Sequence, residues 1–317
     1  MPLWEPPLFT RLAPARRVLV AGAGGGFDVY AGLPLALALR AQGKEVALAN
    51  LTFSNLRGSD ARRLTPDLAE VRATTTGQEH YFPERTLARW LAAEGLPDTV
   101  YAFEKVGVRP LRASWRVLVE TIRPDAIVLV DGGTDLLMRG DEAGLGTPEE
   151  DMASLAAVAA LTEVPIRLAV CIGFGIDSYH GVCHAHFLEN VAALARDGGY
   201  LGAFSVPPDG DEGRGFLDAV AAAQAGTPGR PSIVSGQIAA AMQGDFGDVA
   251  FTSRTQGSEL FVNPLMALYF AFELEAVARR ALYLDLLEPT ETMFEVTARV
   301  EGFRRSIQAR PRRAIPH

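Results

Sequence analysis

Short apolar runs alternate with helical patterns along most of the chain. The runs RRVLVAGAG, EVALANLTF, AIVLVDGGTD and PIRLAVCIGFG are short, rich in aliphatic residues and end in small or polar residues, which is typical of buried strands. The segments LPLALALRAQGK, SWRVLVETIRPD, TPEEDMASLAAVAAL and CHAHFLENVAALARDGG have the length and periodicity of helices. Strands that alternate with helices predict an α/β fold, with a single doubly wound, mostly parallel, Rossmann-like sheet and helices on both faces.

The pattern also predicts how the chain is divided. The chain contains no stretch with the composition of a linker, so we predict one α/β domain over residues 1–317. The polar region 57–104 is expected to elaborate one edge of the sheet, and residues 305–317 to form a frayed basic tail. The apolar patterns at 264–287 and 289–306 predict two long C-terminal helices. The TPEEDM segment predicts a helix with Thr147 as its N-cap, Pro148 at its first position and Glu150 completing a capping box.

Composition narrows the classes of partner. The net charge of -8 over 317 residues gives no support for binding nucleic acid or an acidic membrane, so a small-molecule substrate is expected. The two cysteines, Cys171 and Cys183, lack a CxxC spacing, and we find neither a signal pattern nor a run long enough to span a bilayer. These features predict a cytoplasmic protein. The apolar C-terminal helices predict a homo-oligomer.

Aspartates follow three of the predicted strands. Asp28 follows GAGGGF, Asp131 and Asp135 lie in VDGGTD, and Asp177 ends IGFGID. Ligands of open parallel sheets bind at the carboxyl ends of the strands, where such turns converge. Three acidic turns at equivalent positions therefore predict one shared acidic pocket.

The first turn does not match a dinucleotide loop. A GxGxxG fingerprint that starts at Gly22 or Gly24 has Phe27 or Val29 at its third glycine position. Backbone N–H groups of Gly24, Gly25 and Gly26 can still bind a ligand oxygen. We expect the Asp28 carboxylate to face a cation, an amine or a sugar hydroxyl, with capping of the following helix as the equally simple alternative.

The second turn gathers acids around one arginine. DGGTDLLMRGDE contains Asp131, Asp135, Asp141 and Glu142 with Arg139. Adjacent carboxylates repel, so such a set needs a divalent cation, a cationic substrate, an arginine or a raised pKa. We predict Asp28, Asp131 and Asp135 as ligands of a divalent cation, Mg²⁺ or Ca²⁺. Glu149, Glu150 and Asp151 occupy the first turn of a helix, where the dipole favours acids, and no chemistry is assigned to them.

The third turn is followed by histidines. His180, His184 and His186 lie within seven residues beyond Asp177, and His180 and His184 share a helix face only if the helix begins before His180. We predict Asp131, Asp177 or His180 as the proton-transfer group. Arg139 and Arg254 are candidates for binding the substrate, Arg254 as an anion clamp in the loop before Pro264.

Three stretches resemble one known family. VLVAGAGGGFDVYAGLPLALAL, DGGTDLLMRGDE and SGQIAAAMQGDFGDVAFTSRTQGSELFVNPLM resemble the bacterial and archaeal family called domain of unknown function 1152, over nearly the whole chain. The resemblance implies a single soluble domain and no defined activity. The loop GGGFDVYAGLPLALA is also similar in style to the first turn of nucleoside hydrolases, which binds calcium and ribose hydroxyls, but it lacks their tight aspartate cluster.

The sequence supports one leading hypothesis and two alternatives. The leading hypothesis is an enzyme that hydrolyses or transfers a group at a C–N, glycosidic or phosphoester bond of a small polar substrate. The first alternative is an NAD(P)- or flavin-dependent oxidoreductase, with Ser54 and Arg57 holding a 2′-phosphate. The second is a noncatalytic protein that binds a small ligand.

Overall fold

A computed structural model describes residues 5–257 and 260–315. It contains one nine-stranded sheet with the strand order β3-β4-β5-β2-β1-β6-β7-β9-β8. The strands are β1 (Arg17–Gly22), β2 (Glu45–Leu51), β3 (Arg62–Thr65), β4 (Leu68–Val71), β5 (Val100–Phe103), β6 (Ala126–Asp131), β7 (Ile166–Cys171), β8 (Tyr200–Ser205) and β9 (Leu268–Glu273).

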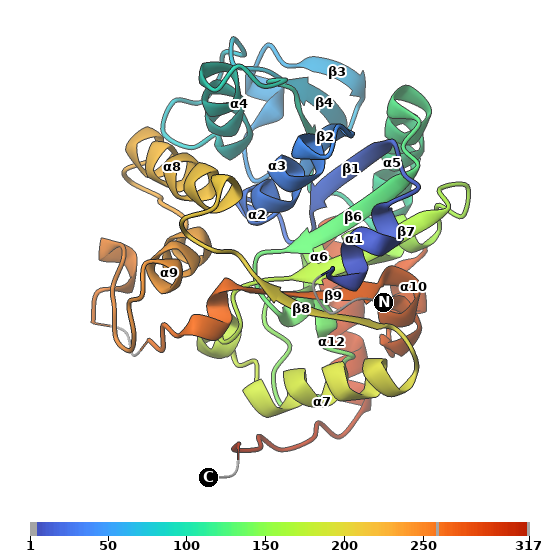
Figure 1. Cartoon of the computed structure of the whole chain (residues 1–317). Helices are drawn as coiled ribbons and strands as arrows, with labels where there is room; N and C mark the ends of the chain where they lie inside the picture. Colours follow the sequence, from blue (N-terminus) through green and yellow to red (C-terminus); the bar gives the residue numbers. More distant parts are fainter. Residues whose placement is uncertain (1–4, 258–259, 316–317) are drawn as a thin grey trace.

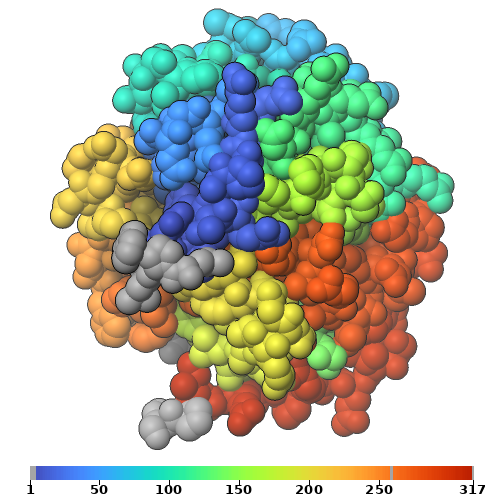
Figure 2. Space-filling model, turned by 45° about the vertical axis from the view of Figure 1, so that its right-hand side comes forward, coloured from blue at the N-terminus to red at the C-terminus, as the bar shows by residue number. Residues whose placement is uncertain are grey.

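The sheet is mixed rather than mostly parallel. The central strands β5, β2, β1, β6 and β7 pair in parallel, as predicted for segments joined by helices. The outer strands β3, β4, β9 and β8 all pair antiparallel. Residues 57–104 form one edge of the sheet, as predicted, and lie at the top of the molecule in Figure 2 (cyan to teal), whereas the C-terminal segment (red) forms the bottom.

Twelve α-helices occur in the described residues and cover both faces of the sheet (Figure 1). They are α1 (Pro7–Leu12), α2 (Asp28–Ala31), α3 (Leu33–Ala41), α4 (Pro83–Ala93), α5 (Val108–Ile122), α6 (Pro148–Ala159), α7 (His184–Arg196), α8 (Asp211–Gly226), α9 (Ile233–Met242), α10 (Leu274–Arg280), α11 (Leu284–Leu287) and α12 (Met293–Ser306). None of these helices is long and apolar enough to cross a membrane.

Alternating side chains of the central strands build two cores. Leu19 and Ala21 of β1 face a core formed with α5, α6, α10 and α12, whereas Val18 and Val20 of β1 face a core formed with α3, α4 and α8. All four side chains are fully buried. A strand that is buried on both faces has a continuous apolar sequence, which is why the run RRVLVAGAG predicted β1 correctly.

One of the two predictions about the C-terminal helices is wrong. The segment 264–287 is not one long helix: β9 occupies Leu268–Glu273, and only the short helices α10 and α11 follow it. The run LYFAFE is rich in aromatic residues and short, so it adds a strand to the open edge of β7. The second helix is confirmed as α12, Met293–Ser306.

The basic tail is bound to the molecule at Arg310. Its side chain forms ion pairs with Asp141 at 3.0 Å and Glu189 at 2.7 Å, and its backbone N–H donates to the carbonyl of Asp141 at 2.8 Å. The tail is therefore not frayed at this point, contrary to the prediction.

Candidate functional site

The site lies where the winding of the sheet changes direction. The chain proceeds from β1 to β2 on one side, whereas β6 pairs with β1 on the other. Between β1 and β6 the connections diverge, and this is the position at which open parallel sheets bind ligands. The N–H of Ala23 donates to the carbonyl of Val130 at 2.8 Å and holds the two strand ends together.

Three carboxylates converge at this position. Each of Asp28, Asp131 and Asp151 offers an oxygen, and the three oxygens lie within 4.8 Å of one another. We call these three residues the acidic cluster. The side chains of Asp131 and Asp151 are 3% and 2% exposed, and Asp28 is half-buried. The cluster is thus nearly enclosed, with Asp28 on its accessible side.

Glycines leave the room that the carboxylates occupy. A Cβ at Gly24 would lie 2.8 Å from carboxylate oxygens of both Asp28 and Asp151. A Cβ at Gly132 would lie 2.9 Å from Oδ1 of Asp28. Side chains at these positions would collide with the cluster, so the glycine turns serve to bring carboxylates together.

Asp28 does not cap a helix. Its Oδ2 accepts a hydrogen bond from the N–H of Gly24 at 2.7 Å, and α2, which begins at Asp28, has no side-chain cap bond. The capping alternative is therefore wrong. Burial raises the pKa of Asp28 to about 7, although the Gly24 N–H opposes the shift and the charge of Asp135 adds to it.

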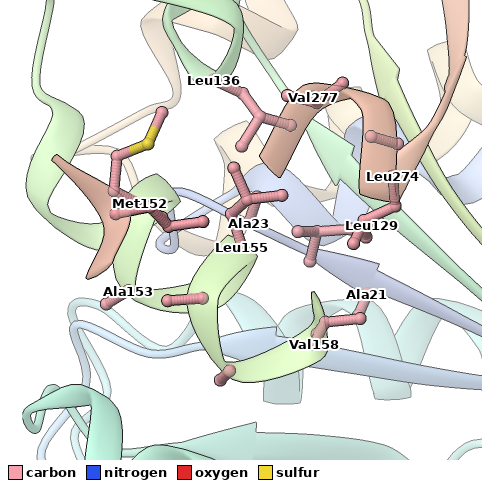
Figure 3. Packing of buried hydrophobic residues seen from close by; sticks show 14 of the residues in the cluster. Ala21, Ala23, Leu129, Leu136, Met152, Ala153, Leu155, Val158, Leu274 and Val277 are labelled. Atoms are coloured by element: carbon pink, nitrogen blue, oxygen red, sulfur yellow. The ribbon is translucent and has the colours of Figure 1, made fainter. Parts of the chain in front are cut away.

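Asp151 enters the cluster from the first turn of α6. Figure 3 shows how α6 packs: Met152, Ala153, Leu155 and Val158 lie among Ala21, Ala23, Leu129, Leu274 and Val277. The hydroxyl of Ser154 also donates to the carbonyl of Ala23 at 2.7 Å. This packing places the Asp151 carboxylate beside those of Asp28 and Asp131, a position that the sequence did not predict for this first-turn acid.

Asp151 also has an unsatisfied oxygen. Its Oδ1 is buried and has no hydrogen-bond partner among the described residues. Burial, followed by the charges of Asp135, Asp131 and Asp28, raises its pKa well above the usual range. A buried carboxylate oxygen without a partner is costly, so this oxygen is free to bind a cation.

Asp131 lies at the end of β6 and is repelled by the other acids of the site. Its Oδ2 accepts from the N–H of Leu136 at 3.1 Å, and the thiol of Cys171 lies at 3.7 Å. Burial and the charges of Asp135, Asp177 and Asp28 raise its pKa well above the usual range.

Asp135 and Asp177 lie beside the cluster but are held by protein donors. The N–H and hydroxyl of Thr147 donate to Oδ2 of Asp135 at 2.8 and 3.3 Å, so Thr147 forms no capping box on α6. The N–H and hydroxyl of Thr134 donate to Oδ2 of Asp177 at 2.6 and 3.1 Å. A Cβ at Gly133 would lie 2.9 Å from oxygens of both Asp131 and Asp177, so these two carboxylates flank the same glycine.

The histidines do not form a metal site on one helix face. Helix α7 begins at His184, and His180 ends a separate 3₁₀ turn, Ile176–His180. The αL glycine Gly181 separates the two, with φ of 95°. His180 is exposed, whereas His184 packs against Phe174 at 5.2 Å between ring centroids.

The other residues predicted to bind a ligand are two glycines of the first turn and two arginines. Gly25 and Gly26 have positive φ, and Cβ atoms there would lie 2.9 Å from the ring of Phe53 and 3.1 Å from the hydroxyl of Tyr81, respectively. Arg254 is bound at the start of α9, where its Nη1 donates to the carbonyl of Pro231 at 2.8 Å. Arg139 instead faces Asp141, with Nε 3.3 Å from a carboxylate oxygen.

The sequence did not predict a buried hydrogen-bond network next to the glycine turn. Nδ2 of Asn50 donates to the carboxyl of Glu84 at 2.7 Å and to the carbonyl of Gly26 at 2.8 Å. Glu84, in the first turn of α4, is fully buried, and burial raises its pKa to about 7. Nothing in the sequence placed Glu84 near β2, because α4 belongs to the edge elaboration that the polar pattern left undefined.

The chemistry of the cluster suits a hard divalent cation. Mg²⁺ and Ca²⁺ bind carboxylate oxygens, and a cation would remove the repulsion among three buried acids. The unpartnered Oδ1 of Asp151 fits such an ion. Asp28, Asp131 and Asp151 could therefore hold a metal ion, with Asp151 in the place predicted for Asp135.

Comparison with known proteins gives a family but no activity. Searches among curated proteins and among solved structures produced no match. A family model described as a protein of unknown function matches residues 19–305. The chain therefore belongs to the DUF1152 family, as its three conspicuous stretches predicted.

Proposed function

We propose that the protein is a divalent-cation-dependent hydrolase or transferase that acts on a small polar substrate at a C–N, glycosidic or phosphoester bond. The observation that carries this proposal is the convergence of Asp28, Asp131 and Asp151 at the switch point of the sheet, with Oδ1 of Asp151 unpartnered. Buried acids that only repel one another would cost stability without a ligand.

The roles of the side chains follow from their partners. Asp28, Asp131 and Asp151 would hold the cation, which would polarise the substrate or a bound water. Asp177 is the candidate proton-transfer group: the two donors of Thr134 fix one of its oxygens, and its carboxylate flanks Gly133 together with Asp131. His180 is exposed in its 3₁₀ turn, which makes it a weaker candidate for this role.

The dinucleotide alternative has less support. The carboxylates of Asp28 and Asp151 flank Gly24, where a loop for phosphate would present free backbone donors. A bare pyrophosphate at this turn would meet two acids.

The experiment is a titration of the full chain with Mg²⁺, Mn²⁺ and Ca²⁺ by calorimetry. We expect one site in the wild-type protein, and Asp151→Asn should weaken binding by at least about ten-fold, because each ligand carboxylate contributes charge. Asp218→Asn, which removes an exposed acid of α8, is the matched control and should bind as the wild type does.

Two results would overturn the proposal. One is unchanged cation binding by Asp151→Asn in a protein that remains folded by circular dichroism. The other is thermal stabilisation by NADP(H) together with no response to any of the three cations.

A further inference from the structure

The first turn of α9 lies against the acidic cluster. Cγ1 of Val234 lies 3.4 Å from the position of a Cβ at Gly132, and Oδ1 of Asp28 lies 2.9 Å from the same position. Helix α9 has ten residues, and its N-cap Ser232 accepts from the N–H of Ser235 at 3.0 Å. The positive end of this helix is therefore a near neighbour of Asp28.

Arg254 is held at the start of α9, and Arg230 lies beside that start in the sequence. The Nη1 of Arg254 donates to the carbonyl of Pro231, the residue before the N-cap of α9, and the hydroxyl of Thr252 accepts from the N–H of Arg254 at 3.1 Å. Arg230 directly precedes Pro231 in the chain. These contacts fix the side chain of Arg254 at the start of α9.

Tyr81 lies beside the glycine turn, and the charges of the arginines and of Asp28 act on it. Its hydroxyl lies 3.1 Å from the position of a Cβ at Gly26, above the glycine turn. Burial and the carboxylates of Glu84 and Asp28 raise its pKa, and the charges of Arg254 and Arg230 oppose that shift. The charges of Asp28 and of both arginines therefore act on the same hydroxyl group.

Lys105, on another side of the site, is already engaged. It forms an ion pair with Glu150, the neighbour of Asp151, and its Nζ lies 4.6 Å from the ring centroid of Phe53. The other positive groups on this side of the glycine turn are Arg230, Arg254 and the start of α9.

This arrangement of charges specifies a ligand. A free anion would be repelled by three carboxylates, and a cation alone would need no arginines. A phosphate group bound to a divalent cation satisfies both sides, because its oxygens can accept from guanidinium and helix N–H groups while they coordinate the ion.

We propose that the substrate carries a phosphate group, which binds between the cation of the acidic cluster and the pair Arg230 and Arg254 at the start of α9. The inference rests on the proposed function and selects the phosphoester among the bonds named there. Phosphate monoesters and diphosphates share this chemistry.

The test is calorimetric titration of the Mg²⁺-loaded full chain with inorganic phosphate, repeated with pyrophosphate. We expect binding in the wild type, no binding without Mg²⁺, and about ten-fold weaker binding in Arg254→Met and in Arg230→Met, because each removes a charge-assisted hydrogen bond. Tighter binding of pyrophosphate than of phosphate indicates a diphosphate substrate, and equal or weaker binding indicates a monoester. Arg116→Met, on the exposed face of α5, is the matched control and should leave binding unchanged.

Binding of Mg²⁺ by itself separates the two proposals. Arg230→Met and Arg254→Met should bind Mg²⁺ as the wild type does. Two results would contradict the phosphate inference and leave the cation site standing, provided that Mg²⁺ binds normally. One is that the wild type binds neither phosphate nor pyrophosphate. The other is that a variant with both Arg230→Met and Arg254→Met binds them as well as the wild type does. If Mg²⁺ does not bind, the proposed function itself is wrong.

Discussion

Two halves of the stretch DGGTDLLMRGDE contain buried acids with opposite surroundings. Asp131, in the first half, faces Asp28 and Asp151 and receives one backbone N–H at 3.1 Å. Glu142, in the second half, is fully buried but accepts from the N–H groups of Arg139 and Gly140 at 3.1 and 2.9 Å and from Asn190 at 2.7 Å.

The difference distinguishes a structural acid, Glu142, from an acid of the candidate site, Asp131. Arg310 adds a positive charge 3.5 Å from Glu142, so that carboxylate is satisfied by the protein itself. No arginine or lysine forms an ion pair with the acidic cluster in the described ranges 5–257 and 260–315. The protein compensates the charge of Glu142 with its own donors, whereas the acidic cluster is left without a counter-charge, which is the basis of the proposed cation site.

The largest effect is expected at Glu142. Glu142→Ala leaves the donors of Asn190 and two backbone N–H groups without an acceptor, and it should lower the free energy of unfolding by about 3 to 5 kcal/mol. Urea unfolding followed by circular dichroism measures the loss. A loss below about 1 kcal/mol would contradict the scaffold role.

Glu84 is an intermediate case, because its hydrogen-bond partners are neutral. Its pKa rises from 4.5 to about 7, so the unfolded chain loses this proton first and stability falls as the pH rises between these values. The contribution of Glu84 changes by about 1.4 kcal/mol per pH unit in this range, and it is greatest below about pH 4.5. Glu84→Gln should remove this part of the slope, measured as the difference from wild type in urea unfolding at pH 5 and pH 7. Parallel pH dependences in the two proteins would show that Glu84 is ionised without cost.

Asp131→Asn should have the opposite effect on stability to Glu142→Ala. Without divalent cations it relieves repulsion and should raise the free energy of unfolding by about 1 kcal/mol. With cation at about 100 times its dissociation constant, the wild type should gain about 2.7 kcal/mol and the variant almost nothing. Thermal unfolding with and without Mg²⁺ provides both readings. A variant that is less stable than wild type in EDTA would place Asp131 with the scaffold acids.

The smallest effect is expected at the basic tail. Arg310 is 30% exposed and pairs with the exposed Glu189 as well as with Asp141, so Arg310→Met should cost about 1 kcal/mol. The part of the loss that comes from the pairs with Asp141 and Glu189 should shrink at high salt, since these pairs are open to solvent. A salt-independent loss measured by urea unfolding would show that packing, rather than charge, holds the tail.

The sequence predicted the structure correctly where a local pattern is typical of one kind of element. The continuous apolar runs located the central strands, and the glycine and aspartate residues after them located Asp28, Asp131, Asp135 and Asp177 at one end of the sheet. It failed for LYFAFE, where a short apolar run fits a helix or a strand, and the open edge of β7 decided between them.

The sequence by itself determined the α/β class, the central strands, the acidic turns and the family. The tertiary structure alone decided which acids meet. Asp151 looked like an ordinary first-turn acid, and only the packing of α6 on β1 and β6 turns it toward Asp28 and Asp131. The same structure pairs Arg139 with Asp141 and leaves His180 exposed. The reason is physical: residue type and spacing fix local backbone geometry, whereas the neutralisation of a buried charge depends on side chains from distant segments that only packing brings together.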